Sequence, residues 1–507
     1  MSLWESVLYG FSVSLEPINI FYCFMGVLMG TLIGVLPGIG PVATISILLP
    51  ATFKMSPVAG IIMLAGIYYG AMYGGSTTSI LVNIPGEAAS VVTCLDGYQM
   101  ARKGRAGPAL GISAFGSFIA GTFAVVALTF LAPPLAEIAL KLGPPEYFSL
   151  VILGFTLLAY LAHGSMIKAL MMACIGLLMS CIGLDYISGF ERFTYGVAIL
   201  EDGIGLVPVA MGVFGVGEVL INVEESLGKR NIFKTKITDL FPNLKDWKEA
   251  IFPILRGSVV GFFLGILPGG GAVIASFTSY AMEKRLSRHP EEFGKGAIAG
   301  VAGPESANNA GAGGNFIPLM TLGIPANPVM ALMMGALVIH GLQPGPLLLA
   351  QNPEVFWGVI ASMYIGNVLL LVLNLPLIGM WVRVLRVPYP ILFPLILLFC
   401  LIGSYSINNN KFDVLIMALF GMIGYLMKRT RFEAAPLLLA MVLGPMLENA
   451  LRQSLIMSGG SFLIFITRPY SAAFVGLAGV LLIYPIVKMI GGGKTRLPAK
   501  LPGEDYS

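Results

Sequence analysis

Charged side chains are scarce in this sequence. Of its 507 residues only 11% are Asp, Glu, Lys or Arg, against about 25% in soluble globular proteins. A chain of this length with so few charges lacks the polar surface of a water-soluble protein. Apolar stretches of about 20 residues, long enough to cross a bilayer, recur throughout it. We therefore predict an all-α polytopic membrane protein that lies in a lipid bilayer and has about ten to twelve membrane segments.

Cysteine and histidine are also few. The five cysteines form no Cys-x-x-Cys pair and lie mostly in apolar stretches, and the three histidines are isolated. The pattern predicts small buried hydrophobes rather than metal ligands or disulfides. The N-terminus lacks a basic region followed by a small-residue cleavage site, so we expect no removable signal peptide.

Several motifs of enzyme and nucleotide chemistry are missing. The sequence contains no phosphate-binding loop of the Gly-x4-Gly-Lys-Ser/Thr type, no His-Glu-x-x-His and no Gly-x-Ser-x-Gly. We therefore expect no enzymatic activity, no cofactor and no direct ATP hydrolysis. The formal net charge of +4 gives no reason to expect a nucleic-acid partner. If the protein uses energy, it would have to come from an ion gradient.

Glycine and proline, in contrast, are abundant, and they reveal an internal repeat. Glycines spaced by four residues lead into Leu-Pro-Gly twice in the chain. Two further pairs follow in the same order: Gly-Gly before Ile-Pro, and then Gly-Pro. The order and the near-constant offset predict two homologous halves, at roughly residues 15–135 and 245–375. The matching glycines are Gly26, Gly30, Gly34 and Gly38 in the first half and Gly257, Gly261, Gly265 and Gly269 in the second.

Each glycine ladder ends in a predicted helix break. Spacing by four places the glycines on one helix face, where another backbone can approach closely, so helix packing alone accounts for Gly26 to Gly34. In the Leu-Pro-Gly that follows, proline removes a backbone donor and glycine loosens the helix. Such breaks at membrane depth are tolerated where they line a cavity or are buried in protein. Paired breaks in two halves are typical of a transporter site.

The basic residues exchange places between the halves. In the first half the segment around residues 102–105 carries three basic residues, whereas the segment after the Leu-Pro-Gly break carries only Lys54. In the second half residues 284–295 after the break are basic, and the segment around His340 lacks Lys and Arg. Because basic loops stay in the cytoplasm, equivalent loops would face opposite sides. This pattern predicts an inverted repeat with broken or re-entrant helices.

The same reasoning divides the chain into five parts. These are a first repeat half at 1–135, connecting transmembrane helices at 136–222, a cytoplasmic loop at 223–250, a second repeat half at 251–375, and C-terminal helices with a cytoplasmic tail at 376–507. Within the connecting part the orientation predicts spans at 146–162, 165–184 and 204–222. Arg452 and Arg468 fit poorly, because their segment would lie outside or along the interface.

Two polar runs stand out against the apolar background. One is Gly74-Gly75-Ser76-Thr77-Thr78-Ser79, and the other is Pro304-Glu305-Ser306-Ala307-Asn308-Asn309. We interpret both as helix breaks at comparable places in the two halves. Unwound backbone and hydroxyl or amide side chains offer oxygen ligands to a small cation, and helix N-termini attract an anion. The alternative is that these residues only satisfy backbone groups freed by the breaks.

Glu305 is the acidic residue that we single out, because an ionisable group at membrane depth is a functional candidate by default. If it faces water in a loop, it has no such role. We expect both runs to converge near the bilayer midplane around one substrate and its coupling ions. Na⁺ is placed at Ser76, Thr77, Asn308 and Asn309. The candidate substrate- and ion-binding residues are Gly38, Gly40, Ser76, Thr77, Thr78, Ser79, Asn83, Gly269, Gly270, Gly271, Glu305, Ser306, Asn308, Asn309, Asn315 and Thr321.

At these motifs the sequence resembles the large membrane subunit of the tripartite tricarboxylate transporters, the TctA family. The resemblance rests on the residues around the two Leu-Pro-Gly motifs, on the two polar runs with the Ile-Pro that follows each, and on Asp96-Gly97-Tyr98. It covers roughly residues 15–450. The residues that carry it are 34–41, 73–79, 83–86, 96–98, 265–271, 303–310 and 322–325.

The resemblance implies uptake of a carboxylate such as citrate across the bacterial inner membrane, driven by a Na⁺ or proton gradient. It also implies two partners, which are a small membrane subunit of about four helices and a periplasmic solute-binding protein. An elevator-like movement follows only by analogy with other inverted-repeat carboxylate transporters. The rival interpretations are a transporter of another organic anion that works alone, a channel, and a membrane-embedded enzyme.

Overall fold

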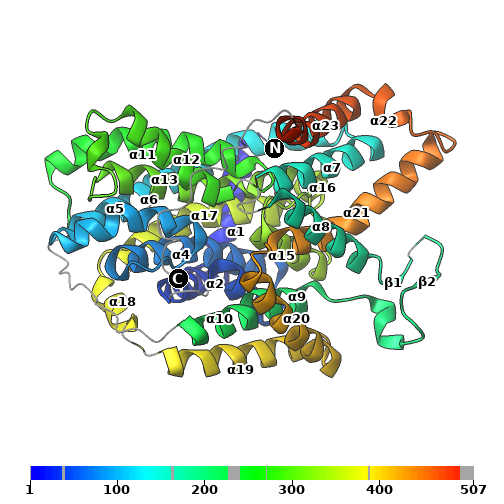
Figure 1. Ribbon diagram of the computed structural model, residues 1–507, viewed down its shortest axis with the longest axis horizontal. Coiled ribbons are helices and arrows are strands. Elements are labelled where there is room, and N and C mark those ends of the chain that lie inside the picture. The colour runs from blue at the N-terminus through cyan, green and yellow to red at the C-terminus, as the bar shows by residue number, and fades with distance from the viewer. Residues whose placement is uncertain are drawn as a thin grey trace.

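The computed structural model is almost entirely helical (Figure 1). It describes residues 2–36, 40–161, 165–185, 187–225, 240–269, 271–385, 387 and 389–490. A two-stranded antiparallel pair, β1 (Gly183–Leu184) and β2 (Glu191–Arg192), supplies the strands of this described part. In Figure 1 this pair projects at one end of the molecule.

Seven described helices are long and apolar enough to cross a membrane, so the expectation of a polytopic helical membrane protein is confirmed. These seven segments are Pro17–Val35, Pro57–Val82, Ala106–Ala139, Leu206–Glu224, Leu244–Ile266, Pro353–Asn374 and Pro390–Asn408. Shorter apolar helices are Gly40–Thr52, Met166–Ser180, Pro328–Ile339 and Pro469–Ile483.

The first half of the chain forms six α-helices and a short 3-10 helix. They are α1 (Leu3–Ser14), α2 (Pro17–Val35), α3 (Gly40–Thr52), α4 (Pro57–Val82), η1 (Ala88–Ser90), α5 (Val91–Arg102) and α6 (Ala106–Ala139). The predicted end of this half at residue 135 therefore falls inside α6. The connecting part holds α7 (Pro144–Tyr160), α8 (Met166–Ser180), η2 (Ala198–Asp202), α9 (Leu206–Ala210), η3 (Met211–Val216) and α10 (Gly217–Glu225).

α11 starts at Leu244, within the segment assigned to a loop at 223–250. The elements of the second half are α11 (Leu244–Ile266), α12 (Gly271–Leu286), η5 (Pro290–Glu292), α13 (Ala299–Gly314), α14 (Phe316–Leu322), α15 (Pro328–Ile339), α16 (Pro346–Gln351) and α17 (Pro353–Asn374). The C-terminal part contains α18 (Ile378–Val384), α19 (Tyr389–Asn408), α20 (Lys411–Arg429), α21 (Ala435–Met457), α22 (Ile464–Thr467) and α23 (Pro469–Ile490).

The glycine ladders make close helix contacts in both halves. A Cβ placed on Gly26, Gly30 or Gly34 of α2 would come within 2.3 to 2.4 Å of a carbonyl oxygen of α4. On α11 the ladder makes the same kind of contact, because a Cβ on Gly257, Gly261 or Gly265 would lie 2.2 to 2.3 Å from a carbonyl oxygen of α13. Only glycine allows the helix backbones to approach this closely.

Both ladder helices end where Leu-Pro-Gly begins. α2 stops at Val35 and α11 at Ile266, and the next residue in each case has extended backbone, with φ −81° and ψ 118° for Leu36 and φ −77° and ψ 127° for Leu267. After the second break Gly269 has φ +80°, which favours glycine. The Gly269 N–H donates to the Ala326 carbonyl at 2.9 Å. The break in α11 is thereby joined to the loop that follows α14.

Neither polar run is unwound, which corrects the expectation that they are helix breaks. Residues 74–79 continue α4, and residues 304–309 continue α13. The left-handed residues come later. Asn83 (φ 61°) follows the end of α4, and Gly323 (φ 69°) follows the end of α14, the helix after α13. The glycine, alanine, serine and threonine residues within the two runs let other helices pack closely against them.

The two runs also differ in position. Gly74 lies against Gly34 on α2, and Gly314 lies against Gly265 on α11, so these two glycines correspond. By this register Ser76 corresponds to Phe316. The acidic run at 304–309 therefore stands about three turns earlier in α13 than the hydroxyl run stands in α4. The expectation that the runs are equivalent is wrong, although both helices are buried through these stretches.

The two arginines that fitted the charge pattern poorly are both paired with acids. Arg452 on α21 bonds Asp185 at 2.9 Å and Glu448 at 2.6 Å. Arg468 bonds Glu146, at the start of α7, at 3.1 Å. Because Glu146 lies in the first turn of α7 and Asp185 follows α8, these pairs hold the C-terminal helices against the connecting ones.

Candidate functional site

The centre of the candidate site is the carboxylate of Glu305, which is 0% exposed on α13. Two hydroxyls donate to it from the first half of the chain. Ser76 of α4 donates to Oε2, and Thr93 of α5 donates to Oε1. The hydroxyl of Ser113, from α6, interacts with the same carboxylate. Four helices therefore meet at one buried acid.

Glu305 has no basic partner among the residues that the structure describes. An ionised carboxylate in an apolar interior is costly unless it is paired or hydrogen-bonded. The hydroxyls supply hydrogen bonds but no positive charge. This arrangement can accept a proton, or a small cation that prefers oxygen ligands.

A second buried carboxylate lies on the same side of α13. Glu87, 7% exposed, follows the unwound residues after α4. Its Oε2 accepts the Ala89 N–H at 2.5 Å, and its Oε1 accepts the side-chain amide of Asn308 at 3.1 Å. Because Asn308 lies three residues after Glu305, both acids are held against one face of α13.

Two more asparagines of the second half bond first-half helices. The amide of Asn309 donates to the Ser117 hydroxyl of α6 at 2.7 Å and to the Glu305 carbonyl at 3.0 Å. The amide of Asn315 donates to the Tyr68 hydroxyl of α4 at 2.7 Å. Tyr68 is among the largest fully buried side chains. The bonds to Ser117 and Tyr68 join the two halves.

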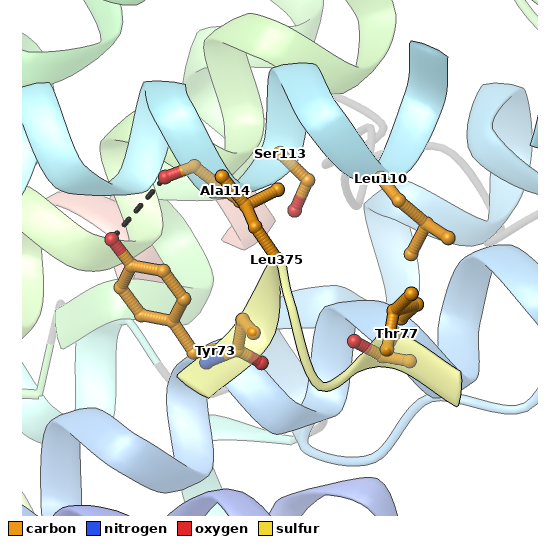
Figure 2. A pocket seen from close by; sticks show the side chains of 8 residues that line it. Tyr73, Thr77, Leu110, Ser113, Ala114 and Leu375 are labelled. Carbon is orange, nitrogen blue, oxygen red and sulfur yellow. Dashed lines mark hydrogen bonds between the residues drawn. The ribbon is translucent and has the colours of Figure 1, made fainter. Parts of the chain in front are cut away.

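A small pocket lies between α4, α6 and the segment at the end of α17, and Ser113 lines it (Figure 2). Figure 2 shows Tyr73 and Thr77 of α4 facing Ser113 and Ala114 of α6, with the Tyr73 hydroxyl donating to the Ala114 carbonyl. Asn374 also lines it, and its side-chain carbonyl is buried without a hydrogen-bond partner. The pocket therefore brings polar groups to the side of the cluster that Ser113 faces.

Several predicted site residues instead serve the backbone. Thr78 donates to the carbonyl of Val35, the last residue of α2, at 2.7 Å. The hydroxyls of Ser79, Ser306 and Thr321 each donate to a carbonyl one turn earlier in their own helix. Asn83 ends α4. For these residues the alternative interpretation, satisfaction of backbone groups, describes what the structure contains.

The predicted glycines mark the breaks. Gly40 begins α3 with φ +60° and Gly271 begins α12 with φ +47°. A Cβ placed on either glycine would have no atom within 4 Å. Gly269 packs against Leu158 of α7. Gly38 and Gly270 lie outside the described residues.

The four residues predicted to hold Na⁺ do not share a partner. Ser76 bonds Glu305, Asn308 bonds Glu87, and Asn309 bonds Ser117. Thr77 lines the pocket of Figure 2. The oxygen atoms that could bind a cation are gathered around Glu305 and Glu87 and not around these four residues as a set.

Sequence reasoning missed most of the partners at this site. Thr93, Ser113 and Ser117 are single hydroxyls in apolar helices and carry no motif. Asn327 had a signal, because it stands after Ile324-Pro325 as Glu87 stands after Ile84-Pro85. Its amide bonds Tyr68 at 3.1 Å. The residues at the site that the prediction did not include are Tyr68, Tyr73, Glu87, Thr93, Ser113, Ser117, Asn327 and Asn374.

Asp96 holds the loop that leads into α13. It lies one turn after Thr93 on α5 and is fully buried. Its Oδ1 accepts the backbone N–H groups of Gly294, Gly296 and Ala297 at 2.7 to 2.9 Å, and its Oδ2 accepts the Tyr280 hydroxyl at 2.9 Å. One helix therefore presents a hydroxyl to Glu305 and anchors the loop that leads into α13.

We expect Asp96→Ala to lower the melting temperature of the purified protein strongly. The change leaves three backbone N–H groups without their acceptor. That of Ala297 is buried and the other two are partly buried, and an unsatisfied buried donor costs about 1–3 kcal/mol. Asp96→Asn keeps one acceptor and should lose less. The measurement is thermal unfolding in detergent, with Asp202→Ala as the exposed control. An unchanged melting temperature for Asp96→Ala would show that the loop is held by other contacts.

Comparison with known proteins agrees with this architecture. The family model of the tripartite tricarboxylate transporter TctA family matches residues 20–439. An uncharacterized 52.8 kDa protein of Agrobacterium vitis, from the region 3′ of ttuC′ in TAR-I, is 55% identical over 484 residues, which are 95% of this chain and 96% of the relative. An uncharacterized protein from the corresponding TAR-II region of the same organism is 56% identical over 230 residues, which are 45% of this chain and 95% of the relative. No solved structure matches. With the family model spanning most of its length, the chain belongs to the tripartite tricarboxylate transporter TctA family.

Proposed function

We propose that this multi-pass membrane protein is the large permease subunit of a binding-protein-dependent system that takes up a di- or tricarboxylate, such as citrate, across the bacterial inner membrane. A Na⁺ or proton gradient drives the uptake. A small membrane subunit of about four helices and a periplasmic solute-binding protein complete the system. The family membership supports the transporter class and the partners.

The observation that carries the proposal is Glu305. A buried carboxylate with hydroxyl donors and no basic partner in the described chain is a group that binds and releases a cation. It lies where helices of the two halves meet. An inverted repeat whose halves alternate access, by an elevator-like movement, would expose this group first to one side and then to the other.

The orientation of the halves is also part of the proposal. The ammonium group of Lys103, after α5, donates to the carbonyl of Lys295, before α13, at 2.6 Å. The two basic loops that charge asymmetry assigns to the cytoplasm are therefore neighbours. We place both loops, and the pairs Arg105–Asp246 and Arg256–Glu283 near them, on the cytoplasmic side.

The proposal predicts gradient-driven accumulation. The complete three-component system in vesicles should concentrate labelled citrate or succinate when it is given only an inward Na⁺ or proton gradient, because a coupled cation supplies the free energy. Uptake that requires ATP and survives collapse of both gradients would contradict this. The chain alone serves as the test of the stand-alone alternative, and equilibration without accumulation is the result expected of a channel.

A further inference from the structure

Glu87 carries a charge that its structural role does not need. The side chain caps the helix that begins at η1 and reaches across to Asn308 of the other half. In the second half, Asn327 does the same with a neutral side chain. It caps α15 by accepting the Met330 N–H at 2.9 Å, and it donates to Tyr68 of the first half at 3.1 Å.

These two pairs correspond residue by residue. The same separation in sequence leads from Glu87 to Asn327, from Tyr68 to Asn308, and from Gly74 to Gly314. An asparagine is therefore sufficient for the cap and for the bond between the halves. The acid at position 87 must be explained by something other than folding, because burying a charge is costly.

A positive charge near Glu87 would balance its carboxylate. The described residues place no Lys, Arg or His within ion-pair distance of it. Beside it, the side-chain carbonyl oxygen of Asn308 is buried and accepts no hydrogen bond. The two N–H groups that donate to the Glu87 carboxylate bring no full positive charge, and the amide oxygen beside it has no donor. A cation between the carboxylate and this amide oxygen satisfies both.

We propose that Glu87 and the Asn308 carbonyl bind a monovalent cation of their own, separate from the one at Glu305. Na⁺ would be held by the oxygen atoms of both side chains. A proton would instead be bound to the Glu87 carboxylate. Its O–H would donate to the carbonyl oxygen of the Asn308 side chain after that amide group rotates. This inference rests on the proposed function. It means that two cations are transported with each carboxylate substrate and offset two of the substrate's negative charges.

Direct binding measurements test the proposal without requiring transport. In the Na⁺ case, the purified full chain in detergent binds two ²²Na⁺ ions, whereas Glu87→Gln and Glu305→Gln each bind one. In the proton case, infrared difference spectra across a pH change contain two carboxylic-acid carbonyl bands, and each variant loses one. Glutamine at position 87 can still accept the Ala89 N–H, as Asn327 does for Met330, so the fold should survive. An unchanged melting temperature checks this.

Glu137→Gln, which removes an exposed carboxylate from α6, should keep the wild-type stoichiometry. The inference is overturned if Glu87→Gln binds as many Na⁺ ions as the wild type and retains every carboxylic-acid band, or if the wild type has neither signal. These results differ from failure of the proposed function, in which two cations bind but the complete system accumulates no carboxylate.

Discussion

Replacement of Glu305 by glutamine should nearly abolish gradient-driven uptake while leaving the protein folded. Glutamine has almost the same volume. Its amide oxygen can accept a hydrogen bond from one of the two hydroxyls of Ser76 and Thr93, and its NH2 group can donate to the other. It cannot carry a negative charge, so the coupling ion loses its strongest ligand. The loss of a charged partner costs about 2–3 kcal/mol of binding free energy. That cost corresponds to roughly a 30- to 150-fold loss of cation affinity.

The measurement is the initial rate of labelled citrate or succinate uptake by the complete system in vesicles, at several Na⁺ and proton concentrations. Expression is matched by quantifying the subunit. Ser76→Ala and Thr93→Ala should raise the cation concentration needed for half-maximal uptake by smaller factors, because each removes one oxygen ligand. Glu137→Gln should behave as the wild type. Wild-type cation dependence in Glu305→Gln would mean that this acid only fastens helices together.

Gly261→Leu should prevent the protein from folding. A Cβ at this position would lie 2.2 Å from the carbonyl oxygen of Ala307 and 2.6 Å from its Cα, so even alanine cannot fit unless α11 and α13 separate. Forcing extra groups into a packed interior costs about 1–3 kcal/mol or more. That cost is a large share of the about 5–15 kcal/mol by which domains are stable. The displacement would also move Glu305, which lies on the same helix as Ala307.

The yield of monodisperse protein in size-exclusion chromatography measures this effect. Gly261→Ala should reduce the yield or the melting temperature, and Gly261→Leu should leave little folded protein. The control is Gly476→Leu on α23, where an added Cβ meets no neighbouring atom. Normal yield and stability of Gly261→Leu would show that α11 and α13 are less tightly packed than these distances indicate.

The sequence by itself determined the class of the molecule and much of its local architecture. The scarcity of charge identified a membrane protein, because hydropathy is a property of composition. The spacing of Gly257, Gly261 and Gly265 predicted a close helix contact, because residues four apart share one face wherever the helix lies. Leu-Pro-Gly predicted where α2 and α11 end, because proline and glycine act on the backbone locally.

The identity of the site was only partly predictable. Glu305 was singled out because an acid in apolar surroundings is conspicuous in any sequence. Thr93 and Ser113 carried no such signal, since lone hydroxyls are common in membrane helices and often bond their own backbone. The polar runs were expected to be unwound, whereas both are helical. Serine, threonine and glycine are compatible with either state, and neighbouring helices decide which one forms.

What tertiary structure alone decided is which polar groups meet. Ser76 and Glu305 are 229 residues apart, and Glu87 and Asn308 are 221 residues apart. Nothing in a one-dimensional pattern specifies which face of α4 turns toward which face of α13. That choice depends on how the glycine ladders seat each helix against its neighbour, and packing of this kind is a property of the whole interior. It is also what left two acids buried without a basic partner in the described chain, a condition that no local stretch of sequence could reveal.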